Sequence, residues 1–307
     1  REVPGPILIS QPDGPGFKVE GHQISWQNWN FHVRVDQRTG PNISVVRYTD
    51  QGEDRPIMYQ AYLSEIFVPY MDPGFAWHAR NFIDAGEFSG MGIFKSLLRG
   101  QDCPDYALYT HSLNIESNGR PTTVNDSLCI FERDQGDPAW RHVENNNTAS
   151  RPKRDLVVRS AAVIGNYDYL FDWVFRQDGS IEASVGATGI VEVKMSPQKN
   201  AYTVAKDSQG SAAADAYGRF IDPHVIGVNH DHYFSFRVDL DVDGPKNNFI
   251  LDKLEQQRLK GDRRKSIWVK KSTALTSEAT AKLNINLQKP ALWRVFSDRR
   301  KNHVGYP

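Results

Sequence analysis

The chain has 307 residues, and its 37 lysines and arginines are matched by 37 aspartates and glutamates. A neutral chain lacks the basic excess that nucleic-acid and membrane-surface binders normally carry, so we expect neither partner. Hydrophobic residues make up 39% and charged residues 24%, which is ordinary for a folded globular protein, and no apolar run approaches the roughly 18 residues of a membrane helix.

The composition favours strands separated by turns. The 7 Trp, 12 Tyr and 15 Phe are strand-forming residues, and the 23 Gly and 17 Pro supply turns. We therefore predict an all-β, mainly antiparallel fold, a large β-sandwich with few short helices. Residues 1–20, which contain the turn-rich sequence QPDGPG, are predicted as an N-terminal linker and first strand region, and residues 21–307 as the sandwich domain.

The first candidate for chemistry is the sequence FIDAGE at 82–87, which follows VPYMDP at 68–73. Between Ile83 and Ala85, the carboxylate of Asp84 is expected to be partly buried. Desolvation would then raise its pKa toward the value that a general base needs near neutral pH. The sequence Asp-Ala-Gly at this point also fits an ordinary turn.

Cys103 and Cys129 are the two cysteines, and 25 residues lie between them. Two unrelated thiols in a reducing cytosol and one disulfide in a secreted protein both fit this count. Three glycosylation sequons, which begin at Asn42, Asn125 and Asn146, fit the secretory route. We expect a secreted glycoprotein with one disulfide, with a peroxisomal or cytoplasmic protein as the alternative.

The middle of the chain predicts a β-hairpin. In residues 167–175, aromatic side chains alternate along one side of the segment, and the turn sequence QDG then leads to a second strand at 181–185. The first strand opens with GNYDY at 165–169, which is either a functional motif or aromatic packing beside a turn. Upstream, the polar segment 145–154 is predicted as an exposed loop because it contains Pro152.

The longest alternation of apolar and polar residues covers 230–243, which predicts one long strand. His230 and His232 fall on the same face, with Cα atoms roughly 6.6 Å apart. Both imidazoles could therefore reach one metal ion, although a third ligand would have to come from elsewhere. The alternative is two half-buried histidines that close the apolar face of the strand.

The opposite face of the same segment carries Asp239, Asp241 and Asp243. Three carboxylates on one face suit a hard cation such as calcium. A solvated strand face with Arg237 as the counter-charge is the alternative. Beyond it, the apolar positions within 249–260 are spaced as on a short surface helix, and we predict one there.

Taken together, the motifs resemble the catalytic domain of the copper-containing primary amine oxidases, the topaquinone enzymes, over nearly the whole chain. The resemblance implies that Tyr167, in Asn-Tyr-Asp, is the quinone precursor and that Asn166 holds its orientation. It also implies that Asp84 is the catalytic base and that Tyr70, in Val-Pro-Tyr, hydrogen-bonds the quinone.

The resemblance further implies a copper site, a peripheral calcium-type site, a disulfide and a gated substrate channel. The residues are His230 and His232 for copper, Asp239, Asp241 and the Leu240 carbonyl for the calcium-type site, Cys103 and Cys129 for the disulfide, and Phe82 with Trp77 for the channel.

The implied activity is oxidative deamination of primary amines, with copper and a topaquinone as cofactors. A small amine and dioxygen are then the expected partners, and aldehyde, ammonia and hydrogen peroxide the products. Asp84 would remove the α-proton of the amine from within an aromatic pocket that raises its pKa. Phe82 favours an aromatic or aliphatic monoamine, and family-wide dimerisation implies a homodimer.

Two positions depart from the family pattern. Val163 stands three residues before the motif asparagine, where the family usually has threonine, so a hydroxyl beside the cofactor is missing. The family's third copper histidine falls beyond residue 307, because His303 is the only histidine after His232 and does not match its position. We therefore expect a chain truncated at both ends and incomplete at its C-terminal side.

Two other functions fit parts of the sequence. One is a non-catalytic relative that keeps the sandwich as a binding module. The other is a glycan-binding β-sandwich with a structural metal, which only the aromatic content suggests. The retention of Tyr167, Asp84, Tyr70 and both motif histidines argues against the loss of the site.

Overall fold

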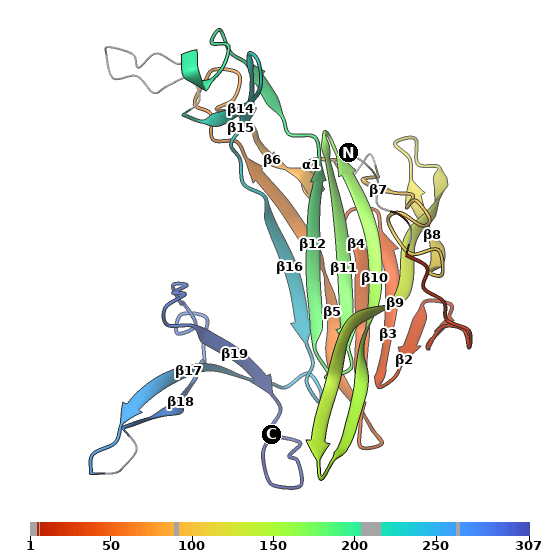
Figure 1. The fold of residues 1–307 in the computed structure, drawn as a ribbon, viewed down its shortest axis with the longest axis vertical. Helices are drawn as coiled ribbons and strands as arrows, with labels where there is room; N and C mark the ends of the chain where they lie inside the picture. The colour runs from red at the N-terminus through yellow and green to blue at the C-terminus, as the bar shows by residue number, and fades with distance from the viewer. Residues whose placement is uncertain (1–4, 6, 89–91, 204–215, 262–264) are drawn as a thin grey trace. The chain divides into compact units, whose positions relative to one another are not determined.

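The computed structural model describes residues 5, 7–88, 92–203, 216–261 and 265–307. The chain forms two compact units, Arg1–Ser44 with Ala61–Arg237 and Val45–Gln60 with Val238–Pro307. Among the described residues the only α-helix is α1 (Asp84–Phe88). A short 3-10 turn covers Ala201–Thr203, and the remaining elements are strands (Figure 1). This confirms the predicted all-β, mainly antiparallel class.

The first sheet has the strand order β1-β2-β3-β4-β5-β16, and β6 pairs with β5. The boundary between the two units falls inside β4, β5 and β16. The strands are β1 (Phe17–Glu20), β2 (Gln23–Trp26), β3 (Trp29–Asp36), β4 (Gly40–Asp50), β5 (Glu53–Pro69), β6 (Asn81–Ile83) and β16 (Tyr233–Leu240).

The second sheet belongs to the first unit and has the order β12-β11-β10-β9-β8, and β7 pairs with β10. Figure 1 shows β10, β11 and β12 side by side in this sheet. The strands are β7 (Phe94–Lys95), β8 (Leu108–Ile115), β9 (Pro121–Glu144), β10 (Asn147–Ile164), β11 (Tyr167–Arg176) and β12 (Ile181–Gly189).

The predicted hairpin is confirmed, because β11 and β12 pair antiparallel from Tyr167 opposite Gly189 to Phe175 opposite Ile181. Gly179 adopts a φ of 87° in its turn, which glycine tolerates without strain. The predicted loop at 145–154 is wrong. Asn145 and Asn146 form a two-residue turn with positive φ, and β10 begins immediately after it. The sheet accommodates Pro152 at a register shift between β9 and β10.

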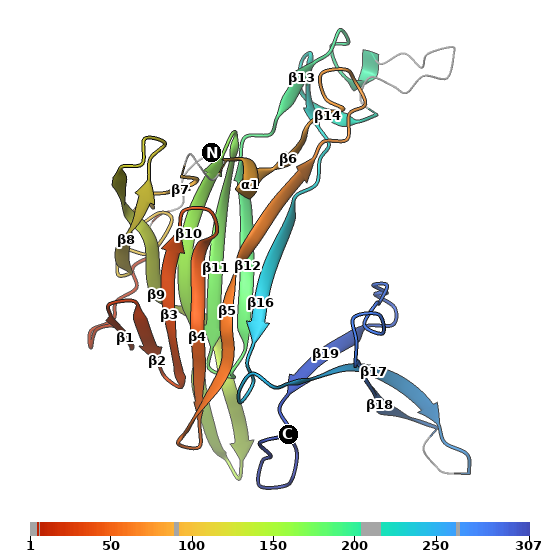
Figure 2. The same cartoon turned by 180° about the vertical axis from the view of Figure 1, so that it is seen from behind.

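The core of the first unit lies between its two sheets, which face each other in Figures 1 and 2. Phe31 of β3 stacks on Phe175 of β11 with ring centroids 3.9 Å apart. Tyr169 of β11 meets Phe234 of β16 edge-on at 5.4 Å. The aromatic residues of β11 alternate toward this interior, as the period of two predicts.

A disulfide joins Cys103 to Cys129 of β9, which confirms the expected bond. Both cysteines are buried in a small apolar cluster that includes Leu97 and Phe131. The first unit also contains a small sheet of order β13-β15-β14, made of β13 (Val193–Met195), β14 (Gly218–Asp222) and β15 (Val225–Val228).

The second unit contains a three-stranded sheet of order β18-β17-β19, made of β17 (Asn248–Arg258), β18 (Ser266–Ala274) and β19 (Ala291–Phe296). The helix predicted at 249–260 is therefore wrong. Asp252 is buried in the middle of β17, where it accepts hydrogen bonds from Ser272 of β18 and Arg294 of β19. Pairing on both sides overrides a local spacing that also fits a helix.

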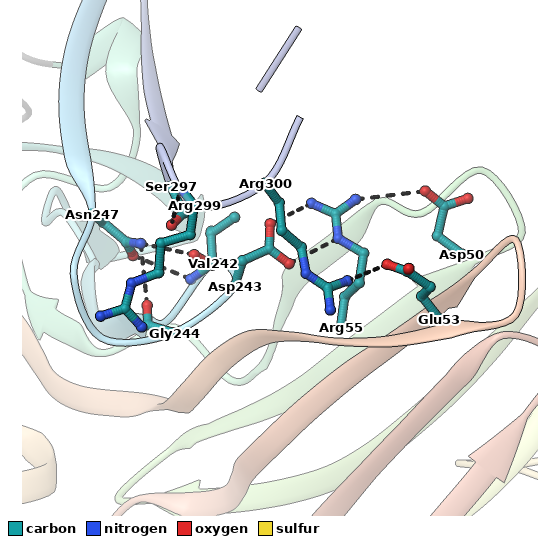
Figure 3. Close-up of polar contacts among 10 residues, drawn as sticks. All are labelled: Asp50, Glu53, Arg55, Val242, Asp243, Gly244, Asn247, Ser297, Arg299 and Arg300. Atoms are coloured by element: carbon teal, nitrogen blue, oxygen red, sulfur yellow. Dashed lines mark hydrogen bonds and ion pairs between the residues drawn. The ribbon is translucent and has the colours of Figure 1, made fainter. Parts of the chain in front are cut away.

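The strand predicted over 230–243 is shorter in the structure, because β16 covers only Tyr233–Leu240. Its C-terminal end gives way to a loop in which Asp243 has a φ of 55°. The Asn247 side chain closes this loop by accepting from the Val242 N–H and donating to the carbonyls of Val242 and Gly244 (Figure 3).

Candidate active site

The first unit brings together the residues that the sequence predicts to be catalytic. Tyr70 directly follows β5, Asp84 is the first residue of α1, and Tyr167 is the first residue of β11. His230 and His232 lie just before β16. Five side chains from four places in the sequence therefore meet at one end of the sandwich, because three of the segments are strand ends.

The chain holds this meeting point together through its backbone. An isolated antiparallel bridge joins Tyr70 to His230, and the Met71 N–H donates to the Asn229 carbonyl at 2.9 Å. The histidine pair therefore continues the pairing of β5 and β16 beyond the regular ladder, which explains why its alternation resembles that of a strand.

The Tyr167 hydroxyl is held by two partners. It lies 3.0 Å from the Tyr70 hydroxyl, and the backbone N–H of Glu192 donates to it at 3.1 Å. Tyr70 is buried, and burial together with the bond to Tyr167 raises the pKa of Tyr70 well above its ordinary value. Tyr70 therefore stays a neutral hydroxyl, able to donate or accept a hydrogen bond at the Tyr167 oxygen.

The two histidines stand beside Tyr167. Their ring centroids are 4.8 Å apart, and that of Tyr167 lies 5.3 Å from His230 and 5.0 Å from His232. The Nδ1 of His230 pairs with the Val228 carbonyl at 2.7 Å, so its Nε2 remains for a ligand. Burial and the neighbouring His230 lower the pKa of His232, which favours the neutral form that binds metals.

The ring nitrogens of His230 and His232 decide whether this pair fits copper. Imidazole nitrogens are suitable copper ligands, and in both rings Nδ1 is engaged, which orients Nε2 as metal sites require. The pair therefore fits as two members of a copper-ligand set. In the described parts of the chain, no group of three His, Cys, Asp or Glu side chains is arranged to hold a metal ion.

Tyr169 links the histidines to the carboxylate, and the sequence reasoning did not assign it a role. Its side chain is fully buried, and its hydroxyl lies 2.7 Å from His232 Nδ1 and donates to Asp84 Oδ2 at 3.5 Å. The sequence does indicate that Tyr169 is near the site, because it is two residues after Tyr167 and a strand places such residues on one face.

Asp84 is 3% exposed, and burial raises its pKa to about 6, while the hydrogen bond from Tyr169 opposes the shift and Glu87 and Glu65 add to it. Glu65 also fixes the start of α1, because its Oε1 accepts from the N–H groups of Ala85 and Gly86 at 3.0 Å. The carboxylate predicted to be a base is therefore held by a short, capped helical turn.

Aromatic rings surround Tyr70. Trp77 lies 5.4 Å and Phe82 6.1 Å from it, and Phe82 in turn meets Phe88 at 6.2 Å. Trp77 is buried, whereas Phe82 is half-buried. The two predicted channel residues thus lie beside the residue that contacts Tyr167.

Asn166 extends the site toward two charged residues that the sequence reasoning missed. Its side-chain amide donates to Glu192 at 3.3 Å, and Glu192 forms an ion pair with Arg80 at 3.4 Å. Glu192 is 25 residues beyond Tyr167 along the chain, and no local motif marks it. Only the fold brings these two charges to the site.

Several predicted residues have other surroundings. Asp239, Leu240, Asp241 and His303 belong to the second unit, whereas the residues around Tyr167 belong to the first. Val163, which departs from the family pattern, lies in β10, and its N–H donates to the Ile93 carbonyl at 2.9 Å.

Comparison with known proteins decides the family. The sequence profile described as "Copper amine oxidase, enzyme domain" matches residues 18–307. The chain belongs to the copper amine oxidase family. Its relatives include the copper-containing amine oxidase gamma 1 of Arabidopsis thaliana, 41% identical over 98% of this chain, and the primary amine oxidase of Klebsiella aerogenes, 37% identical over 98%. The peroxisomal amine oxidase alpha 2 of A. thaliana is 37% identical over 97%.

Solved structures of this family share the fold. An Aspergillus nidulans amine oxidase aligns with a TM-score of 0.83 and 25% identity over 100% of this chain and 40% of its own. A copper-containing benzylamine oxidase from Hansenula polymorpha aligns with a TM-score of 0.78 and 29% identity, over 90% of this chain and 41% of its own. The chain spans less than half the length of these relatives, 43% of A. thaliana gamma 1 and 39% of the K. aerogenes enzyme.

The helices in the described part of the chain are too short to cross a membrane.

Proposed function

We propose that this copper amine oxidase chain takes part in the oxidative deamination of primary amines. In that reaction a primary amine, dioxygen and water give an aldehyde, ammonia and hydrogen peroxide. The observation that carries the proposal is the placement of Tyr167, whose hydroxyl contacts Tyr70 and whose ring adjoins both histidines. The raised-pKa carboxylate of Asp84 is linked to the same histidine pair through Tyr169.

Two of the copper ligands in this proposal are His230 and His232. Copper bound there would, with dioxygen, convert the Tyr167 ring to a topaquinone, which supplies an electron sink for the two electrons that the amine loses. The neutral state of His232 and the paired Nδ1 atoms support this assignment.

Asp84 acts as the general base in this proposal. With a pKa of about 6 it is mainly ionised at pH 7, yet basic enough to take a proton from the carbon next to the amine nitrogen. Tyr169 orients this carboxylate by its hydrogen bond, and burial to 3% exposure limits its contact with water. Tyr70 and Asn166 hold the Tyr167 side chain and the start of its strand in place.

The rings of Phe82 and Trp77 support an aromatic or aliphatic monoamine as the substrate, because both present apolar surface beside Tyr70. The benzylamine oxidase among the structural relatives is consistent with such a substrate.

Further proposals concern the whole protein. The carboxylates of Asp239 and Asp241 with the Leu240 carbonyl are oxygen ligands that suit calcium. We propose a homodimer as the assembly, and residues 21–307 as one catalytic domain that follows the N-terminal region 1–20. The Cys103–Cys129 disulfide supports an oxidising, secretory environment, and the sequon at Asn146 fits a glycan because it lies at an exposed turn.

A phenylhydrazine titration of copper-loaded protein, with copper analysis, tests the proposed function. Phenylhydrazine condenses with a quinone carbonyl and gives a coloured adduct, which we expect on the peptide that contains Tyr167. Tyr167→Phe should give none, whereas Tyr109→Phe, in the disulfide region, should react like the wild type.

The same copper-loaded protein should oxidise benzylamine faster than a diamine, and a preference for diamines alone would refute the substrate class. Folded, copper-loaded wild-type protein without adduct would refute the quinone.

A further inference from the structure

Arg80 and Glu192 lie beside Tyr167 but have no step of their own in the proposed reaction. The Arg80 guanidinium lies 4.0 Å from the centre of the Trp77 ring and forms an ion pair with Glu192 at 3.4 Å. Its Nε donates to the Ala76 carbonyl at 3.1 Å, and its own carbonyl accepts from the Tyr70 N–H at 3.0 Å. One arginine thus ties together the segment from Tyr70 to Arg80.

Glu192 connects this arginine to Tyr167. Its backbone N–H donates to the Tyr167 hydroxyl at 3.1 Å, while its carboxylate accepts from the Asn166 amide and pairs with Arg80. The carboxylate is therefore held on both sides, and this fixes the peptide whose N–H points at the tyrosine oxygen. A shift of Glu192 would move that donor away.

A second ion pair joins the same two segments. Lys194 lies two residues after Glu192 and contacts Asp72, which is 5% exposed and also accepts from the Gly74 N–H at 2.8 Å. The segment 70–80 and the segment 192–194 are thus linked twice, and the Tyr167 hydroxyl is bonded to both of them, through Tyr70 and through Glu192.

The Arg80–Glu192 pair is too exposed to matter much for folding, so its effect on the site can be measured separately from stability. The two side chains are 37% and 33% exposed, and ion pairs of this exposure add little to folding stability. The contacts of Arg80 are nevertheless made to residues that touch the reacting groups. Their loss should leave the fold intact and alter the geometry at Tyr167.

We propose that Arg80 is a positioning residue, which holds Trp77 and Glu192 so that the Glu192 N–H and the Tyr70 hydroxyl fix the orientation of the Tyr167 side chain. This inference rests on the proposed function. It assigns to Arg80 no contact with the substrate, and its effect is exerted through the orientation of the ring that becomes the quinone.

The test compares Arg80→Met with Arg80→Lys and a matched control in copper-loaded protein. Arg99 provides the control, because it lies 4.2 Å from the centre of the Tyr109 ring and pairs with Asp126, as Arg80 does with Trp77 and Glu192. We measure the phenylhydrazine adduct per copper, its absorption maximum, and kcat and KM for benzylamine. Thermal unfolding shows that each variant is folded.

We expect Arg80→Met to lower the adduct yield and shift its absorption maximum, and to reduce kcat about 10- to 100-fold with a smaller change in KM, as a misplaced reacting group does. Arg80→Lys should recover part of the loss, since it keeps a cation near Glu192 and Trp77. Arg99→Met should match the wild type. A folded Arg80→Met protein with wild-type yield, spectrum and kcat would overturn the inference while leaving the quinone intact, whereas an adduct-free wild type would instead refute the proposed function.

Discussion

Asp84 and Asp243 are both nearly buried aspartates, yet their surroundings are opposite. Asp84 is 3% exposed, its hydrogen bond comes from the neutral hydroxyl of Tyr169, and within the described chain no basic side chain pairs with it. Asp243, in the second unit, receives two hydrogen bonds from Arg55 at 2.9 and 2.7 Å (Figure 3). Burial raises the pKa of Asp84 to about 6, whereas Arg55 lowers the pKa of Asp243.

The difference separates a carboxylate suited to chemistry from one suited to structure. A proton is held more tightly at Asp84 than on an ordinary aspartate, so this carboxylate is a stronger base. At Asp243 the hydrogen bonds from Arg55 keep the carboxylate charged to a lower pH than usual, and this charge anchors a loop. In the same unit Arg55 also pairs with Asp50, and Arg300 pairs with Glu53 (Figure 3). Burial alone therefore does not decide the role of an aspartate. The group that hydrogen-bonds the carboxylate, a neutral hydroxyl or a guanidinium, decides it.

The largest expected effect comes from removing the proposed base, Asp84. We expect Asp84→Asn to lower kcat/KM for a primary amine by about 10²- to 10⁴-fold, the usual contribution of a general base. The copper content should not change, because in the described part of the chain Asp84 is linked to His232 through Tyr169 and not directly. Steady-state kinetics with amine-dependent peroxide release measures the loss.

Asp243→Asn is the matched control for that experiment, because it removes a carboxylate of similar burial from the second unit. It should leave kcat/KM within the range of the wild type. If Asp84→Asn were as active as this control, the assignment of Asp84 as the base would be wrong.

The structural carboxylate should respond in the opposite way, through stability. We expect Arg55→Met to reduce the free energy of unfolding by about 3 kcal/mol, because it leaves the Asp243 side chain, 3% exposed, without the cation that hydrogen-bonds it. Arg47→Met breaks an exposed pair with Asp54 and should cost less than about 1 kcal/mol. Urea denaturation of both variants gives the comparison, and equal losses would show that burial of the pair has no consequence.

Sequence reasoning predicted the fold class and the elements that local signals define, but not the elements that depend on long-range pairing. The alternation of 167–175 and the turn before Ile181 predict the hairpin because both signals are local. The strand β17 could not be predicted from its spacing, since only β18 and β19 decide it by pairing with Asp252 on both sides. Arg80 and Glu192 escaped for a related reason, because 111 residues separate them and only the fold makes them partners.

The smallest effect concerns the pH dependence of stability. The folded pKa of Asp84, about 6, lies above the ordinary value of 3.8, so between these values the folded state binds more protons than the unfolded state. Stability contributed by this group is therefore complete below pH 4 and is lost as the pH rises through 6. Asparagine resembles the protonated acid at all pH values, so Asp84→Asn should match the wild type at pH 4 and exceed its free energy of unfolding by about 2–3 kcal/mol at pH 8. Asp243→Asn should show the reverse sign, because a lowered pKa gives stability above the ordinary value that is lost as the pH falls. Parallel denaturation curves at pH 4 and 8 measure both variants, and a stability difference of the same sign in the two would contradict the opposite environments assigned to these carboxylates.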